Sequence, residues 1–292
     1  MRVVSLLPSA TEIVYALGAQ DRLVGVTFEC DEPATARADH RVIVSGRDTA
    51  AMDVAAIDAY VRAELAAGRD LYTLDEGAMA DLAPDVILTQ DLCRVCAVPT
   101  GQVDAALTHL QCHADVVTLD PMTLADVVDS VLTVGDALGA TAQAVEVVTD
   151  LRRRLALLAD AVAGRPRPRT AVVEWVDPLF TGGHWIPDQV AAAGGDPVGM
   201  HPGRASGASS WDDLAAERPE VVLVAPCGYG LDGAAEQAAV VAQHLPDAQV
   251  WAIDGNAVVV RPGPRVVDGV EAIAAVLHPD VIEASPHVRR IT

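Results

Sequence analysis

Residues 123–164 read TLADVVDSVLTVGDALGATAQAVEVVTDLRRRLALLADAVAG, which is the longest helical stretch in the chain. Its apolar side chains recur at three- and four-residue steps, the period of an α-helix. Gly135 and Gly139 are expected to break or cap the first segment, after which residues 140–163 continue as one helix of roughly 35 Å at 1.5 Å per residue. Strand-and-helix blocks of similar size flank this stretch, so it is predicted to be a rigid helix that joins two lobes.

The flanking blocks predict an α/β fold of two Rossmann-like lobes, joined by the long helix, with a ligand cleft between the lobes. A chain of 292 residues with 51% hydrophobic content is long enough for two separate cores. We place the N-terminal lobe at residues 1–122, the connecting helices at 123–165 and the C-terminal lobe at 166–292. The second boundary follows from the alternation of Arg and Pro over residues 165–169, which cannot be helical.

Local patterns predict where some of the elements begin and end. Residues 9–12, Ser-Ala-Thr-Glu, match a capping box and are expected to open a helix that Gly18 closes. Residues 180–185 are predicted to be a glycine-rich loop, and the apolar run 258–260 a short strand.

Charge and motif content exclude several classes of function. The net charge of −21 would repel a nucleic-acid backbone or an anionic membrane surface. All twenty basic residues are arginine, which excludes a Walker lysine and a lysine Schiff base. Neither the GxSxG motif of a nucleophile elbow nor the HExxH motif of a zincin occurs. The sequence also contains no run of about eighteen apolar residues, the length needed to span a membrane.

The start of the chain and its cysteines bear on location. The first residues enter a strand pattern directly, without the apolar segment and cleavage site of a signal peptide. Five cysteines, an odd number, argue against a framework of disulfides and for a reducing compartment. We therefore predict a cytoplasmic protein, with a periplasmic or extracellular location as the alternative if a leader has been removed.

The loops that follow the predicted strands carry the candidate ligand site, because ligands of open parallel sheets lie outside the carboxyl ends of the strands. These loops combine acidic, amide, thiol and aromatic side chains, a mixture suited to a ligand with apolar and polar parts. Two tryptophans within eleven residues, at 175 and 185, are expected to form a stacking surface. The candidate ligand-binding residues are Pro8, Ser9, Glu29, Cys30, Gln90, Asp91, Trp175, Phe180, His184, Trp185, Cys227, Tyr229 and Arg261.

Cys93 and Cys96 form a CxxC motif for which three interpretations stay open. The two thiols are half of a metal site that cysteines distant in the sequence complete, a redox pair, or two small buried side chains in a tight loop. His109 and His113 are four residues apart on a predicted helix. This spacing could hold a metal, and it also suits a partly exposed helix end.

Several motifs spread along nearly the whole chain point to one family. They are SLLPSATE (5–12), GAQDRLVGVT (18–27), PDVIL (84–88), FTGG (180–183) and RPGPR (261–265). With these motifs the chain resembles the helical-backbone class of periplasmic solute-binding proteins, in particular its cobalamin-binding branch.

The resemblance implies two α/β lobes hinged by one long helix, with a corrinoid, haem or ferric chelate in the cleft. Asp53 and Asp213 resemble the acidic positions with which such proteins dock the permease of an ABC transporter. Carried over position by position, the implied ligand neighbours are Pro8, Glu29, Cys30, Gln90, Asp91, Trp175 and Arg261.

The leading hypothesis is a non-catalytic protein that binds cobalamin or a related corrinoid as a solute-binding or carrier protein. Trp175 and Trp185 would contact the tetrapyrrole-like macrocycle, and glycine-rich turns would let backbone amides meet its amide groups. One alternative is a metal-binding or redox protein that works through Cys30, Cys93, Cys96 and Cys227. Another is a protein that binds haem or a ferric siderophore and feeds an ABC transporter.

Overall fold

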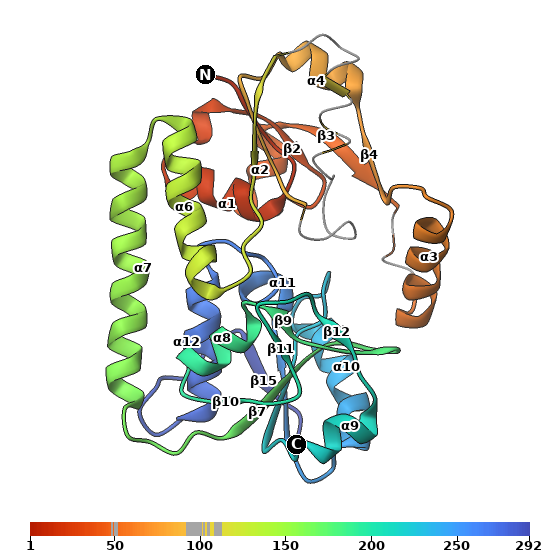
Figure 1. Ribbon diagram of the computed structural model, residues 1–292, viewed down its shortest axis with the longest axis vertical. Helices are drawn as coiled ribbons and strands as arrows, with labels where there is room; N and C mark the ends of the chain where they lie inside the picture. Colours follow the sequence, from red (N-terminus) through yellow and green to blue (C-terminus); the bar gives the residue numbers. More distant parts are fainter. Residues whose placement is uncertain (48, 50–51, 92–100, 102, 104–105, 108–112) are drawn as a thin grey trace. The chain divides into compact units, whose positions relative to one another are not determined.

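The computed structural model describes residues 1–47, 49, 52–91, 101, 103, 106–107 and 113–292 (Figure 1). These residues divide into two compact units. Unit 1 consists of Met1–Asp120 and Asp129–Thr149, and unit 2 of Pro121–Val128 and Asp150–Thr292. Each unit has its own sheet with helices, mainly parallel in unit 1 and mixed in unit 2, so the prediction of an α/β fold with two lobes is confirmed.

The sheet of unit 1 has the strand order β4-β3-β2-β1-β5-β6, and only β3 and β4 pair in antiparallel fashion. Strands β1 and β5 are buried along their whole length, which is typical of central parallel strands and explains their apolar sequences. The strands are β1 (Val3–Ser5), β2 (Leu23–Thr27), β3 (Arg41–Gly46), β4 (Tyr72–Leu74), β5 (Val86–Thr89) and β6 (Asp115–Thr118). The helices of this unit include α1 (Pro8–Ala16), α2 (Ala36–Asp39), α3 (Val54–Ala66), α4 (Glu76–Leu82) and a 3₁₀ turn, η1 (Gln20–Arg22).

The sheet of unit 2 has the order β12-β8-β7-β13-β14-β15, and β10 also pairs with β7. Its parallel centre is β7, β13 and β14. Its strands are β7 (Arg169–Val176), β8 (Leu179–Thr181), β10 (Asp196–Pro197), β12 (Gly207–Ala208), β13 (Val221–Val224), β14 (Gln249–Ile253) and β15 (Val288–Arg290). Strands β9 (Gly183–His184) and β11 (His201–Pro202) form a separate two-stranded sheet. The helices are α8 (Ile186–Ala192), α9 (Trp211–Ala216), α10 (Leu231–His244), α11 (Gly255–Val258) and α12 (Val266–Leu277).

The predicted connecting stretch forms two helices, α6 (Leu124–Leu138) and α7 (Thr141–Val162). Gly139 separates them with φ +64°, as the sequence predicts. Gly135 neither breaks nor caps α6: a Cβ at this position would collide with the Cβ of Ala144, so the glycine lets α6 and α7 approach closely. The division between the units falls within both helices.

The start of α6 is held from two directions. Thr123 Oγ1 accepts the N–H of Asp126 at 3.1 Å, and Asp126 Oδ2 accepts the N–H of Thr123 at 2.9 Å, which is a reciprocal capping box. The carboxylate of Asp188, on α8, accepts the N–H of Leu124 at 3.0 Å. The first turn of α6 is therefore fixed to α8 within unit 2.

Three local predictions are wrong. Helix α1 begins at Pro8 without a side-chain cap, because proline lacks an N–H and suits the first helical position, so Ser9 lies inside the helix. Residues 258–260 do not form a strand: Asp254 accepts the N–H of Ala257 at 2.9 Å and caps the short helix α11 instead. Residues 180–185, expected to be a loop, contribute to β8 and β9.

Candidate functional site

Two candidate ligand-binding residues of unit 2, Trp175 and Tyr229, lie in ring contact. Their ring centroids are 5.9 Å apart and the ring planes are tilted by 53°. Trp175 lies at the carboxyl end of β7, and Tyr229 follows β13, the parallel neighbour of β7. Because parallel neighbours end at the same edge of a sheet, the pair lies at the edge where open α/β sheets bind ligands.

Phe180 extends this pair. It stands opposite Trp175 in the antiparallel pairing of β7 and β8, and directly opposed residues point to the same face of a sheet. Trp175 Nε1 donates a hydrogen bond to Asp177 O at 3.1 Å, which restricts the indole ring. All three aromatic side chains are half-buried, so each keeps some surface towards solvent. We call Trp175, Phe180 and Tyr229 the aromatic cluster.

An exposed turn carries Cys227 and Tyr229. Gly228 has φ +85°, a conformation that L side chains rarely adopt. The N–H of Gly228 donates to Asn256 Oδ1 at 3.0 Å, and the N–H of Asn256 donates to Tyr229 O at 3.3 Å. Asn256, which the sequence did not single out, therefore holds this turn in place.

Residues 228–233 read GYGLDG and fit the G-x-G-x-x-G pattern of dinucleotide-binding turns, a match that the reading of the sequence missed. The glycines serve another purpose here, because a Cβ at Gly233 would lie 2.5 Å from the Tyr229 ring. The carboxylate of Asp232 lies in the first turn of α10, and that of Asp254 faces the turn, so a pyrophosphate would meet negative charge. We therefore interpret residues 228–233 as the turn that carries Tyr229 of the aromatic cluster, and not as a dinucleotide-binding turn.

His184 and Trp185, at the start of α8, differ in exposure. Trp185 is 3% exposed and its Nε1 donates to Val259 O at 2.8 Å, so the indole lies inside unit 2 and offers no face to a ligand. His184 is half-buried, and this burial lowers the pKa of its imidazole and favours the neutral form. The expected stacking of two tryptophans is thus corrected: Trp175 contacts Tyr229.

Arg261 lies half-buried in the connection between α11 and α12. We call residues 259–265 the Arg261 turn. Pro262 and Pro264 restrict its backbone, and the N–H of Gly263 donates to Arg261 O at 2.9 Å. The turn follows Asp254 and α11 at the carboxyl end of β14, so it belongs to the same edge of the sheet as the aromatic cluster.

In unit 1, Glu29 is the best-oriented candidate. The hydroxyl of Tyr72, from β4, donates to its carboxylate at 3.3 Å and 3.4 Å from the two oxygens. The rings of Phe28 and Tyr72 lie 6.0 Å apart, and Arg37 Nη1 donates to Phe28 O at 2.9 Å. A half-buried carboxylate therefore stands beside two aromatic rings at the carboxyl end of β2.

Two other candidates of unit 1 lie inside it. Cys30 is 0% exposed, and its Sγ lies 3.1 Å from Thr11 Oγ1 and 3.3 Å from Thr27 Oγ1. Ser9 is buried in α1, whereas Pro8 is half-buried at its first position. Cys30 and Ser9 thus stand behind the strand ends and do not present a surface to a ligand.

Gln90 and Asp91 follow β5. Gln90 is buried, and Asp91 is exposed. The N–H of Asp91 donates to Asp120 Oδ1 at 2.6 Å, which joins the ends of the parallel neighbours β5 and β6.

Cys93, Cys96 and His109 lie outside the described residues, so the metal site stays a prediction. Among the residues that the structure describes, no group of three or more His, Cys, Asp or Glu side chains is arranged to hold a metal ion. In the same part of the chain, no helix has both the length and the apolar character needed to cross a membrane.

The two acidic residues expected to dock a permease are both exposed at helix starts. Asp53 Oδ1 accepts the N–H of Ala56 at 2.7 Å, immediately before α3. Asp213 lies in the first turn of α9, and its Oδ2 accepts the hydroxyl of Ser210 at 2.7 Å. Both carboxylates are therefore held in fixed positions within their own units.

A hollow of about 530 Å³ lies elsewhere in unit 2, between α7, α12 and the segment before β15. No candidate ligand-binding residue borders it, so we do not place the ligand there. Its lining includes Arg154, Leu158, Glu271, Ile282 and His287.

Comparison with known proteins gives consistent results. Residues 3–253 match the model of a family described as periplasmic binding protein. A protein of Halobacterium salinarum named cobalamin-binding protein is 26% identical over 288 residues, which cover 95% of this chain and 69% of that protein.

Solved structures share the fold. A periplasmic haem-binding protein from Pseudomonas aeruginosa has a TM-score of 0.71 at 20% identity, with 100% of this chain and 98% of that chain covered. The periplasmic vitamin B12-binding protein BtuF of Vibrio cholerae has a TM-score of 0.65 at 21% identity, with coverage of 94% and 96%. At these identities the likeness concerns the fold alone.

Proposed function

Because the chain belongs to the periplasmic binding protein family, we propose that it binds a corrinoid of the cobalamin type and does not transform it. The protein would act as the solute-binding or carrier component for this ligand. The name of the Halobacterium salinarum relative supports cobalamin over the other flat metal chelates that the sequence left open.

The observation that carries the proposal is the contact between Trp175 and Tyr229 at the carboxyl edge of the sheet of unit 2. A corrinoid has a broad apolar macrocycle, and half-buried aromatic rings bind such surfaces by burying area with little loss of side-chain freedom. Phe180 enlarges this surface from the neighbouring strand. The turn at Gly228 adds backbone groups that can meet the amide side chains of the macrocycle.

Haem is the second candidate ligand. His184 is half-buried beside Trp185, and its lowered pKa favours the neutral imidazole, which is the form that coordinates iron. The two ligands are distinguished by direct competition, since a site that uses His184 as an iron ligand would prefer haem.

Calorimetry with cyanocobalamin and with haemin tests the proposal on the purified chain. Cobalamin is expected to bind in the micromolar range or tighter, and Trp175→Ala to weaken this binding by about thirtyfold, as for a central aromatic contact. Trp211→Ala is the matched control. Trp211 lies in α9, away from the aromatic cluster, and its ring stacks on that of His244 in α10 with 4.2 Å between the ring centroids. Absence of cobalamin heat at high micromolar concentration, or tighter binding of haemin, would reject the corrinoid.

We also propose that Asp53 and Asp213 dock the permease of an ABC transporter. Their exposed carboxylates are held by local hydrogen bonds, so they would present negative charge to arginines of a partner at little entropic cost. Family membership favours a place of action outside the cytoplasmic membrane over the cytoplasmic location expected from the sequence. Charge reversal at both positions should abolish ligand-stimulated ATP hydrolysis by the transporter and leave ligand affinity unchanged.

A further inference from the structure

We propose that Gln189 is a positioning residue for the ligand, because its side-chain amide fixes the Arg261 turn at the edge where the corrinoid binds. The inference rests on the proposed function, and it adds a residue that does not touch the ligand. The sequence marks Gln189 only as a polar residue in a short helix after a proline.

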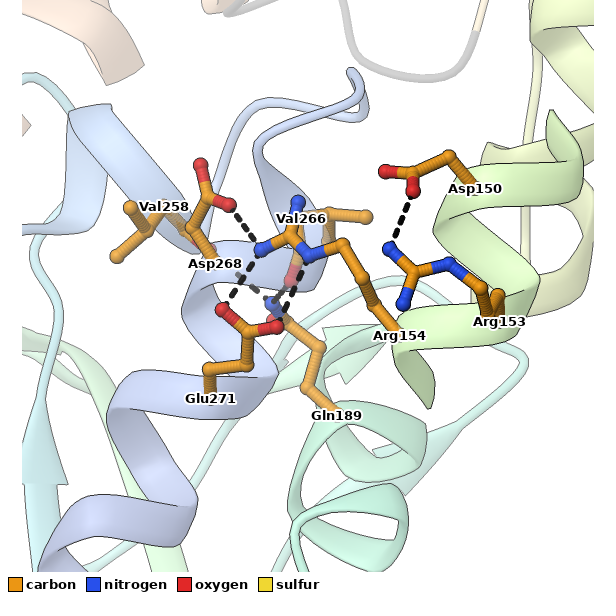
Figure 2. A network of polar contacts seen from close by, with 8 residues as sticks. All are labelled: Asp150, Arg153, Arg154, Gln189, Val258, Val266, Asp268 and Glu271. Carbon is orange, nitrogen blue, oxygen red and sulfur yellow. Dashed lines mark hydrogen bonds and ion pairs between the residues drawn. The ribbon is translucent and has the colours of Figure 1, made fainter. Parts of the chain in front are cut away.

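The amide of Gln189 joins the two ends of the Arg261 turn. Its Nε2 donates to Val258 O at 3.1 Å and to Val266 O at 2.9 Å, one carbonyl before the turn and one after it (Figure 2). Gln189 is 0% exposed, so both bonds are shielded from water. A single side chain of α8 thus links the two ends of the turn.

Only a group with two N–H donors suits this place. Both neighbours are carbonyl oxygens, which can only accept, so the amide is oriented with its nitrogen towards them. Its Oε1 has no hydrogen-bond partner in the part of the chain that the structure describes. A buried oxygen without a partner is unfavourable, and leucine would fill a similar volume without it. The role of Gln189 therefore resides in its two donated bonds.

Two further contacts fix the first end of the turn. Val258 and Val259 end helix α11, where backbone carbonyls lack partners within the helix. Nε1 of Trp185, the residue immediately before α8, donates to Val259 O at 2.8 Å. A Cβ at Gly269 would collide with Val258 O, so α12 packs directly on this end of α11. The backbone on either side of Arg261 is thereby held by α8 and α12 together.

A turn held in this way presents Arg261 to a ligand without an ordering step. Binding to a mobile turn would cost the conformational freedom that the turn loses, and this cost would appear as weaker affinity. Removal of the two donors should therefore weaken ligand binding even though Gln189 itself is buried away from solvent.

The test compares Gln189→Leu with Gln237→Leu. Gln237 is a buried glutamine of α10 in the same unit, and its amide atoms have no hydrogen-bond partner among the described residues. Gln189→Leu is expected to bind cobalamin about tenfold more weakly and to show faster amide hydrogen exchange at residues 259–266. Gln237→Leu should match the wild type in both measurements. Trp185→Phe, which keeps a ring and removes one donor, should shift both in the same direction as Gln189→Leu.

A double substitution distinguishes a role in positioning the ligand from a merely structural role of Gln189. If Gln189 acts through the turn, Gln189→Leu should change affinity by less than about threefold in an Arg261→Ala background. Full additivity, or a Gln189→Leu variant with normal affinity and normal exchange, overturns the inference. If the wild type binds no cobalamin, the proposed function fails, and exchange at residues 259–266 alone decides whether Gln189 holds the turn.

Discussion

The guanidinium of Arg154, on α7, donates to the carboxylate of Glu271, on α12, from Nε at 2.9 Å and from Nη2 at 2.6 Å (Figure 2). Nη2 also donates to Asp268 at 2.5 Å. All three side chains are half-buried. The hydrogen bonds that Arg154 donates to Glu271 and Asp268 keep the pKa of its guanidinium well above the usual value. This bidentate pair binds the connecting helix α7 to the helix that follows the Arg261 turn.

Replacing Arg154 should destabilise unit 2. Arg154→Met leaves two half-buried carboxylates without their cation, and about 1–2 kcal/mol of unfolding free energy is expected to be lost, after allowance for partial exposure. Arg153→Met is the control, because Arg153 pairs with Asp150 at 2.6 Å on an exposed surface, where a pair contributes at most about 0.5 kcal/mol. Urea unfolding of both variants measures the difference; equal losses would contradict the role given to Arg154.

The capping box at the start of α6 should make the stability of this helix sensitive to acid. The hydroxyl of Thr123 and the N–H groups of Met122 and Thr123 lower the pKa of Asp126. A carboxyl with a lowered folded pKa contributes stability above its unfolded pKa of about 4, and this contribution disappears as the pH falls through the folded value. Asp126→Asn should therefore be less stable than the wild type at neutral pH and equal to it in strong acid. Thr123→Ala should cost about 1 kcal/mol at neutral pH.

Urea titrations at several pH values provide the measurement, with Glu146→Gln on the exposed surface of α7 as the control that should match the wild type throughout. A constant difference between Asp126→Asn and the wild type across the acid range would count against the cap.

His184 should give the protein a second, milder acid dependence. Burial lowers its pKa, so the unfolded chain binds the proton more readily than the folded one. The free energy of unfolding should then fall as the pH drops below the unfolded pKa of about 6.5, and level off below the folded pKa. His184→Gln removes this dependence. Parallel stability profiles for the wild type and the variant between pH 7 and 5 would show that burial does not suppress protonation at this site.

Gly269 should not tolerate a side chain. In Gly269→Ala the new methyl group would collide with Val258 O, and α12 could remain in place only if α11 and the Arg261 turn moved. We expect a loss of about 2 kcal/mol or more, as for overpacking of a core. Gly77→Ala in α4, where the nearest atom is 3.4 Å from the Cβ position, should be neutral or slightly stabilising. Thermal unfolding of the two variants tests this contrast.

The cysteine hypothesis is tested by thiol labelling. Cys227 is exposed and should react with a thiol reagent in the folded protein, whereas Cys30 is buried and should react only after unfolding. Cys227→Ser is expected to remove one fast-reacting thiol, and Cys30→Ser none. If Cys30→Ser had one fast-reacting thiol fewer than the wild type, the interior of unit 1 would open readily. Cys30 would then again be a candidate metal ligand.

The sequence predicts secondary structure best where burial allows only one type of element. Residues 86–88 of β5 and all of β13 are apolar because both faces of these central strands are covered, so strand and position are evident from composition. Strand β3 has exposed ends around only two buried residues, and β8 and β9 are only three and two residues long. Such segments acquire their structure from neighbours that are distant in the sequence, and local pattern cannot reveal them.

The capping box shows the same limit at a finer scale. The pattern of a Ser or Thr followed three residues later by an acid occurs at both Ser9 and Thr123. Pro8 occupies the first helical position in α1 and leaves Ser9 inside, whereas Thr123 has no such neighbour and caps α6. In the candidate site, Trp175 and Tyr229 were predicted from the strand ends that carry them. Gln189 was not, because its partners lie about seventy residues away.

Helix α8 serves two neighbours with consecutive residues. Asp188 accepts the first N–H of α6, and Gln189 closes the Arg261 turn. Adjacent residues of one helix move together, so a substitution that loosens α8 should loosen the first turn of α6 and the Arg261 turn at the same time.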